Sequence, residues 1–173
     1  MHIRDLFQQQ RTTFSFEFFP PKTPEAAESL FAAISELETL KPSFVSITYG
    51  AGGSTRDLTH DLVIRLKSRG GLDPFPHLTC VCHQEREIRE ILERYAAAGI
   101  SNIIALGGDV PQSLASWDRS KDAFRYAADL VRYIQQFNGA RLHPDARGFG
   151  IGVAGYPEGH PSTPNRVKEM DLL

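Results

Sequence analysis

One carboxylate stands among aromatic side chains near the start of the sequence, in the stretch FSFEFFPPK at residues 14–22. Alternate side chains of an extended strand face opposite sides, so Phe14, Phe16 and Phe18 share one side and Glu17 takes the other. If the phenylalanines pack against helices, Glu17 points inward, where poor solvation disfavours its charged form. A carboxyl group in such surroundings can act as a general acid.

A structural ion pair is the alternative role for this glutamate. Arg11 and Lys22 are the nearby basic residues that could supply it. Buried carboxylates are costly unless they are paired or used in catalysis, so the spacing leaves both roles open.

Further polar residues follow other strand-like runs. The diglycine in LGGDV, at residues 106–110, would let backbone N–H groups approach a ligand, with Asp109 beside it. Asp109 could equally cap the following turn. The polar residues at or just beyond the carboxyl ends of the expected strands are Glu17, Thr48, Tyr49, Asp109 and Glu158.

A glycine pattern at residues 150–155, GIGVAG, matches the dinucleotide-binding fingerprint G-x-G-x-x-G, and Asp171 stands about where its ribose-binding acid would be. That fingerprint needs a strand before it and a helix opening on it. Here the apolar residues alternate with the glycines, and YPEGHP cannot begin a helix. We therefore expect a strand whose glycines serve either a bulky ligand or close packing.

Two cysteines, Cys80 and Cys82, lie in HLTCVCH between His77 and His83. On a strand they would share a face and be poorly placed to form a disulfide with each other. Their spacing is not that of a C-x2-C zinc site. The pattern favours buried structural thiols, and no metal is expected.

Strand-like and helix-like patterns alternate along the whole chain. Thr23 can cap a helix whose first residue is Pro24, and Gly99 is placed to end another. The patterns predict a parallel sheet, either open and doubly wound or closed as an eightfold barrel, and polar residues at several strand ends favour the barrel. The expected strands span 14–19, 43–50, 76–82, 101–109 and 148–158, and the expected helices begin at 24, 54, 86, 121 and 165.

Length and composition indicate one domain over residues 1–173, and the alternating patterns make it an α/β domain. The chain is 41% hydrophobic and carries 19 basic against 21 acidic residues, without a long run of either sign. Neither a nucleic-acid footprint nor a polybasic membrane surface is indicated, so the expected partner is a small molecule. With no signal-peptide pattern and no apolar run of membrane-spanning length, we expect a cytoplasmic protein.

Five motifs together closely resemble the methylenetetrahydrofolate reductase family: SFEFFPPKTPE, SITYGAGGSTRD, PHLTC, NIIALGGD and GYPEGHP. The resemblance covers residues 14–173, and the first motif is the most specific. It implies a TIM (β/α)8 barrel that holds FAD at its mouth. The enzyme would pass a hydride from NADH or NADPH to methylenetetrahydrofolate and produce methyltetrahydrofolate for methionine metabolism.

The resemblance also implies roles for individual residues. Glu17 corresponds to the general acid that protonates the bridging nitrogen of the folate, and Asp109 to the carboxylate that lies near the flavin pyrimidine and holds the pterin. The other positions that match flavin contacts are Thr48, Tyr49, Ala51, His77, Gly107, Gly108, Tyr126, Ala127, Tyr156, His160 and Asp171.

Two departures from the family pattern stand out. Gly107 takes the place of an arginine found in many relatives, and the pattern ends after about five of the eight β/α units. The chain therefore looks like the truncated N-terminal part of a barrel. The alternatives are a non-catalytic partial barrel that acts as an assembly module by pairing with another copy, as a homo-oligomer, or with another chain, and a flavin-free lyase on the same scaffold.

Overall fold

A parallel sheet forms the centre of the computed structural model, which describes residues 1–50, 56–110, 115–156, 158–159 and 167. Its strands follow the sequence in the order β1-β2-β3-β4-β5. An open doubly wound sheet reverses its strand order at a switch point, whereas a barrel does not. The predicted α/β fold with a parallel sheet is confirmed, and the order is the one that a barrel requires. The strands are β1 (Ser15–Phe18), β2 (Phe44–Ile47), β3 (Pro74–Thr79), β4 (Asn102–Leu106) and β5 (Gly150–Val153).

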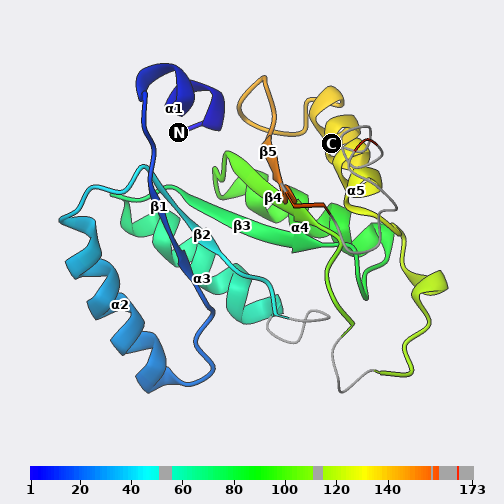
Figure 1. Ribbon diagram of the computed structural model, residues 1–173, viewed down its shortest axis with the longest axis horizontal. Coiled ribbons are helices and arrows are strands. Elements are labelled where there is room, and N and C mark those ends of the chain that lie inside the picture. Colours follow the sequence, from blue (N-terminus) through cyan, green and yellow to red (C-terminus); the bar gives the residue numbers. More distant parts are fainter. Residues whose placement is uncertain (51–55, 111–114, 157, 160–166, 168–173) are drawn as a thin grey trace.

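Helices cover one face of this sheet (Figure 1). They are α2 (Pro24–Glu38), α3 (Arg56–Arg69), α4 (Glu85–Ala97) and α5 (Ala127–Gly139). The core between helices and sheet contains Phe18, Val45, Ile47, Leu78 and Ile103 from the strands, and Ile34, Leu62, Leu92 and Leu130 from the helices. Residues that alternate with these strand positions face the other side, which no described helix covers.

Local sequence signals account for several helix ends. The Thr23 hydroxyl accepts a hydrogen bond from the backbone N–H of Ala26 at 3.2 Å, and Pro24 is the first residue of α2, as predicted. Helix α4 ends at Ala97, and Gly99, two residues later, adopts a φ of +70°. The predicted glycine stop is therefore confirmed.

The start of α5 was predicted wrongly. The expected helix begins at residue 121, but α5 begins at Ala127, after a short 3-10 helix, η3 (Arg119–Lys121). The Asp118 side chain caps η3 through the backbone N–H of Ser120 at 2.9 Å. Asp122 accepts a hydrogen bond from the backbone N–H of Cys82, far away in the sequence. This tertiary contact holds the segment out of a continuous helix.

Strand β3 begins and ends earlier than predicted. It spans Pro74–Thr79, and a turn follows at Val81 and Cys82, where Cys82 has a φ of +60°. The expectation that Cys80 and Cys82 share a strand face is therefore wrong. Both cysteines are free, Cys80 buried in the core and Cys82 half-buried.

The glycine pattern at residues 150–155 lies in strand β5, as expected, and no helix opens on it. A Cβ at Gly150 would lie 2.5 Å from Asn102 Oδ1 and 2.7 Å from Ile3 Cγ2, so close packing explains this glycine. At Gly152 the nearest described atom would be Ile104 Cγ1 at 3.5 Å, an ordinary contact.

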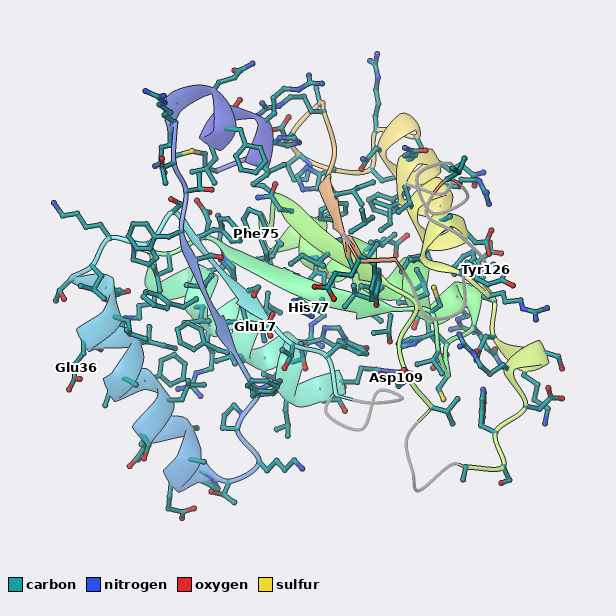
Figure 2. All side chains as sticks on the ribbon, viewed as in Figure 1. Glu17, Glu36, Phe75, His77, Asp109 and Tyr126 are labelled. Atoms are coloured by element: carbon teal, nitrogen blue, oxygen red, sulfur yellow. The ribbon has the colours of Figure 1, made fainter. Side chains whose placement is uncertain are left out.

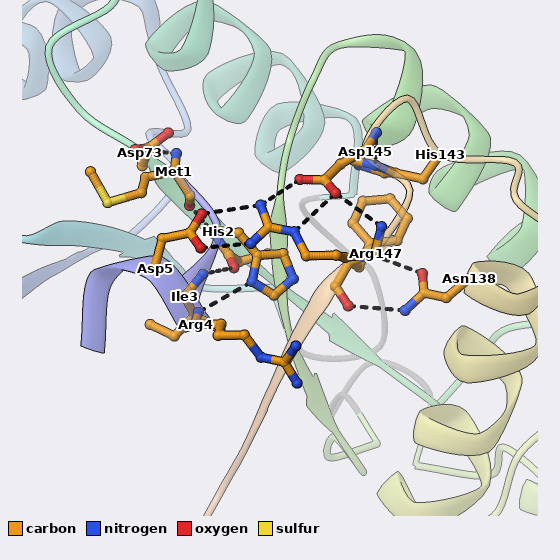
Figure 3. Close-up of polar contacts among 12 residues, drawn as sticks. Met1, His2, Ile3, Arg4, Asp5, Asp73, Asn138, His143, Asp145 and Arg147 are labelled. Atoms are coloured by element: carbon orange, nitrogen blue, oxygen red, sulfur yellow. Dashed lines mark hydrogen bonds and ion pairs between the residues drawn. The ribbon is translucent and has the colours of Figure 1, made fainter. Parts of the chain in front are cut away.

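An N-terminal helix, α1 (Ile3–Gln9), was not anticipated, and it packs against the amino ends of the strands. The backbone N–H of Ile3 donates to Asn102 Oδ1 at 2.7 Å. Arg147 forms ion pairs with Asp5 at 2.6 Å and with Asp145 at 2.7 Å (Figure 3). These contacts cover the amino ends of the strands, which we call the amino edge of the sheet. The carboxyl ends of the strands, the carboxyl edge, are left for a ligand.

Candidate functional site

Polar side chains from three adjacent strands meet on the uncovered face of the sheet. Glu17 of β1 lies opposite Ser46 of β2, whose hydroxyl donates to Glu17 Oε2 at 3.2 Å. His77 of β3 approaches the same oxygen, with Nε2 at 3.3 Å. Figure 2 shows the Glu17 and His77 side chains together at the middle of the sheet. This row of Glu17, Ser46 and His77 is the centre of the candidate site.

The predicted face of Glu17 is confirmed, but its predicted poor solvation is wrong. Phe16 and Phe18 pack on the core side, opposite Glu17. The Glu17 side chain is 50% exposed, because the phenylalanines lie on the far face of the strand and do not cover it. In the described chain the hydroxyl of Ser46 hydrogen-bonds this carboxylate and His77 lies beside it, whereas no ion pair with Arg11 or Lys22 is present there.

His77 holds an available nitrogen beside this carboxylate. Its side chain is only 12% exposed, and burial lowers its pKa, an effect that nearby Glu17 partly opposes. The ring is therefore neutral at pH 7. The approach of Nε2 to Glu17 lacks hydrogen-bond geometry, so Nε2 has no hydrogen-bond partner among the described residues.

The carboxyl end of β3 presents a second polar atom of this kind. The Thr79 hydroxyl is buried and has no hydrogen-bond partner within the described parts of the chain. Gly108 lies directly against it, since a Cβ at Gly108 would be 2.7 Å from Thr79 Cβ and from Val81 Cγ1. Gly108 also has a φ of +77°, which glycine adopts without strain.

The predicted diglycine bend at the end of β4 is thus present. No described atom lies within 4 Å of a Cβ built at Gly107, so a ligand could approach on that side, while the Gly107 carbonyl accepts a hydrogen bond from the N–H of Val81 at 3.3 Å. Asp109 follows the bend and is exposed. Figure 2 shows Asp109 and Tyr126 beyond the ends of β3 and β4.

The end of β2 places two predicted site residues differently. Thr48 is half-buried, whereas the Tyr49 side chain turns into the helix layer and is buried. Its hydroxyl lies 3.0 Å from His83 Nε2, and its ring meets that of His60 edge-on. Tyr49 can therefore contact a ligand at the mouth through its backbone only.

The remaining predicted positions lie on loops at the same edge. Tyr126 is exposed just before α5, and its carbonyl accepts a hydrogen bond from Cys80 Sγ at 3.3 Å. Ala127 is the first residue of α5, and Tyr156 and Glu158 are exposed after β5. Ala51, His160 and Asp171 fall outside the described residues.

Ser46 and Thr79 were missed as site residues by the sequence reasoning. Ser46 alternates with the core residues Val45 and Ile47, so period-two counting could have placed it on the face of Glu17. Thr79 could have been placed in the same way, from its alternation with Leu78. Their contacts depend on strand register, which the sequence does not specify.

Two shallow surface hollows lie elsewhere, between α2 and α3. They measure about 440 and 330 Å³, and both are lined by Pro24, Ala27, Phe31 and Arg65. Phe31 belongs to the helix layer that packs on the core. Because neither hollow is lined by Glu17, Ser46 or His77, we assign them no part in the site.

Two other kinds of site find no support in the described chain. No group of three or more His, Cys, Asp or Glu side chains is arranged to hold a metal ion in those residues. Among the described helices, none combines the length and the apolar character needed to cross a bilayer.

The fold and the site define a class of protein. A parallel sheet in sequence order, with polar side chains and a glycine bend at its carboxyl edge, is typical of α/β enzymes that bind a small ligand there. The chain belongs to the methylenetetrahydrofolate reductase family, whose model matches residues 2–173. The resemblance expected from the motifs is confirmed.

Individual relatives agree with this assignment. The chain is 43% identical over 165 residues to the 5,10-methylenetetrahydrofolate reductase of Pectobacterium carotovorum subsp. carotovorum. The aligned residues cover 95% of this chain and 50% of that protein. The chain is also 40% identical over 159 residues to methylenetetrahydrofolate reductase (NADH) 1 of Arabidopsis thaliana, covering 92% of this chain and 26% of the plant protein. The chain thus spans about half the length of the bacterial relative.

Proposed function

We propose that the protein takes part in reducing 5,10-methylenetetrahydrofolate to 5-methyltetrahydrofolate, with FAD as cofactor and NADH or NADPH as reductant. In this proposal, residues 1–173 form the first five β/α units of an eightfold barrel. The observation that carries it is the row of Glu17, Ser46 and His77, which lies on the uncovered sheet face of a chain from this family.

The described residues fit a flavin at the carboxyl edge. Thr79 and His77 each offer a buried polar atom without a described hydrogen-bond partner, and no described atom lies within 4 Å of a Cβ built at Gly107. Buried polar groups normally have partners, so a polar ligand is a natural complement to them. We assign the holding of the flavin to Thr79, His77 and Gly107. When bound, the flavin supplies hydride transfer between the nicotinamide and the folate.

Glu17 is the proposed proton donor to the folate. The proton passes to the bridging nitrogen as its bond to the methylene carbon breaks, and the electron pair of that bond stays on the nitrogen. The remaining nitrogen and the methylene carbon form an iminium that can accept hydride. Because Glu17 is half exposed in the free chain, the bound ring systems must displace water from it to favour its protonated form.

Asp109 is the proposed partner of the cationic folate. It follows the glycine bend and is exposed, so its carboxylate is accessible to a ligand at the edge of the sheet. A negative charge there stabilises the iminium and helps to hold the pterin.

Flavin titration and turnover test this function. The purified protein in its full native length should bind FAD and, without oxygen, oxidise more than one NAD(P)H per flavin only when methylenetetrahydrofolate is present. Thr79→Val keeps the side-chain shape but removes the hydroxyl, and should weaken FAD binding by roughly 2- to 10-fold, the value of one hydrogen bond. A protein that neither binds FAD nor turns over the folate would refute the proposal.

A role as an assembly module is the second candidate. In the described sheet, β1 and β5 each pair with one neighbour only, so each leaves an edge open to another strand. Size-exclusion chromatography with light scattering separates the two candidates: a stable, colourless dimer without turnover would favour the assembly role.

A further inference from the structure

A buried histidine, His83, lies behind the candidate site at the turn between β3 and α4. Its side chain is fully buried, and both ring nitrogens have partners. It does not reach the uncovered face, where Glu17 and His77 lie. The sequence places His83 next to the cysteine pair, but its contacts are with Tyr49 and Val81.

The contacts of His83 identify its tautomer. Nδ1 lies 2.9 Å from the carbonyl oxygen of Val81, and a carbonyl can only accept, so Nδ1 carries the proton. In a neutral ring Nε2 is then an acceptor. The Tyr49 hydroxyl, 3.0 Å away, must donate to it. The rings of Tyr49 and His83 pack at 5.6 Å between centroids.

Burial keeps this pair neutral. It lowers the pKa of His83 and raises the pKa of Tyr49. The charged groups that act on the pair are Arg56 and Asp57 from α3, Glu87 from α4 and Asp122 from the segment before α5. Arg56 and Glu87 form an ion pair at 2.7 Å, so their opposite charges largely offset each other near His83.

The same turn also joins two neighbouring segments. The carbonyl of Cys82 accepts from Arg56 Nη2 at 3.2 Å, and its N–H donates to Asp122 Oδ1 at 2.8 Å. The carbonyl of His83 accepts from the N–H of Ala123 at 2.9 Å. Chain segments that follow β2, β3 and β4 therefore converge on two consecutive residues.

The geometry points to His83 as a positioning residue for the candidate site, because its Nε2 accepts a hydrogen bond from the Tyr49 hydroxyl. Thr48 and Tyr49 directly follow β2. The hydrogen bond to Tyr49 therefore fixes the position of the backbone at the carboxyl end of this strand. The inference rests on the proposed flavin function, because FAD is the ligand whose binding it should affect. His83 itself touches no proposed ligand.

A double-mutant cycle tests this role in the full-length protein, with FAD affinity measured by fluorescence quenching. His83→Phe and Tyr49→Phe each remove one end of the bond, so Nε2 of His83 loses its partner in one variant and the buried Tyr49 hydroxyl keeps only Arg56 in the other. Each should weaken FAD binding by roughly 5- to 100-fold. The double variant should bind no more weakly than the worse single variant, since both groups act through one bond.

Two further variants separate positioning from stability. His83→Gln places an amide oxygen near the position of Nε2 and should bind FAD within about threefold of wild type. His143→Phe is the matched control, because His143 is also buried and hydrogen-bonded, to the carbonyl of Ile100 at 2.8 Å, but lies among the contacts at the amino edge (Figure 3). It should lower thermal stability without changing FAD affinity.

The tautomer gives a readout that does not depend on FAD. Long-range 15N spectra should show His83 protonated at Nδ1 and bare at Nε2. A proton on Nε2, additive effects in the cycle, or single variants that lower stability but bind FAD normally would each overturn the inference. Failure of the wild type to bind FAD, with the Nδ1–H tautomer intact, would refute the proposed function and the positioning role, while the Tyr49 bond would stand.

Discussion

Nε2 of His77 lies 3.3 Å from Oε2 of Glu17, although the two residues belong to β3 and β1 with β2 between them. Ser46 of β2 donates to the same carboxylate oxygen, so the contact spans three strands on one face of the sheet. Any change of charge at Glu17 should therefore be detectable at the His77 ring.

Glu17→Gln should lower the pKa of His77 further, because the carboxylate charge at present raises that pKa against the effect of burial. NMR titration of the His77 ring measures this. In the full-length flavin-loaded enzyme, the same variant should leave flavin reduction by NAD(P)H nearly intact and slow folate reduction by roughly 10²- to 10⁴-fold.

Glu36→Gln is the matched control for this change. Glu36 is exposed on α2, on the opposite side of that helix layer from the site (Figure 2). It should alter neither the His77 titration nor either half-reaction. Equal damage to both half-reactions by Glu17→Gln would remove Glu17 from the role of proton donor.

Acid should destabilise the fold through His60. This histidine is buried beside Tyr95, with Nδ1 2.7 Å from the hydroxyl, and burial lowers its pKa to about 4. In the unfolded chain its pKa is about 6.5, so between these values the unfolded state binds more protons. Stability is therefore full above pH 6.5 and falls by about 3 kcal/mol as the pH drops toward 4.

Urea unfolding between pH 4 and 7.5 measures this loss. His60→Asn removes the titrating ring but keeps a polar atom near the Tyr95 hydroxyl, and should flatten the dependence. The pKa values of His77 and His83 are lowered in the same direction, so some slope should remain. An unchanged slope in the variant would show that His60 is not the group responsible.

Gly108→Ala should destabilise the protein by about 2–4 kcal/mol, from the left-handed backbone and from overpacking against β3. Its Cβ would lie 2.7 Å from Thr79 Cβ and Val81 Cγ1, at a φ of +77°. Gly107→Ala is the control, since no described atom lies within 4 Å of its Cβ. Thermal unfolding of the two variants compares them directly, and equal losses would contradict the packing argument.

Asp122→Ala should cost about 2–4 kcal/mol, because the Asp122 side chain is 0% exposed and its loss leaves partly buried donors unpaired. Those donors include the N–H of Cys82 at 2.8 Å and the indole N–H of Trp117 at 2.9 Å. Trp117 is the single tryptophan of the chain, so its emission should shift to the red as water reaches the indole.

Asp118→Ala is the control for this prediction. Asp118 is exposed and caps η3, so its removal should cost at most about 1 kcal/mol and leave Trp117 emission unchanged. If both variants lost the same stability, the buried carboxylate of Asp122 would not be the anchor of this segment.

Local patterns in the sequence were sufficient for several features. Period two placed Glu17 opposite Phe16 and Phe18, since neighbouring strand residues must face opposite sides. Thr23 and Gly99 marked helix ends because a cap acts on the backbone within a few residues of itself. The alternation of strands and helices predicted the parallel sheet, and the motifs identified the family.

Other features depended on contacts between distant segments. Ser46 and His77 lie beside Glu17 because strand order and register place β2 and then β3 next to β1, and no local pattern specifies register. Helix α5 begins late because Asp122 bonds to Cys82, and α1 is stabilised by Asn102 and Arg147. Periodicity tells which side of its own element a residue faces, whereas the group that it meets there is decided by the packing of the whole chain.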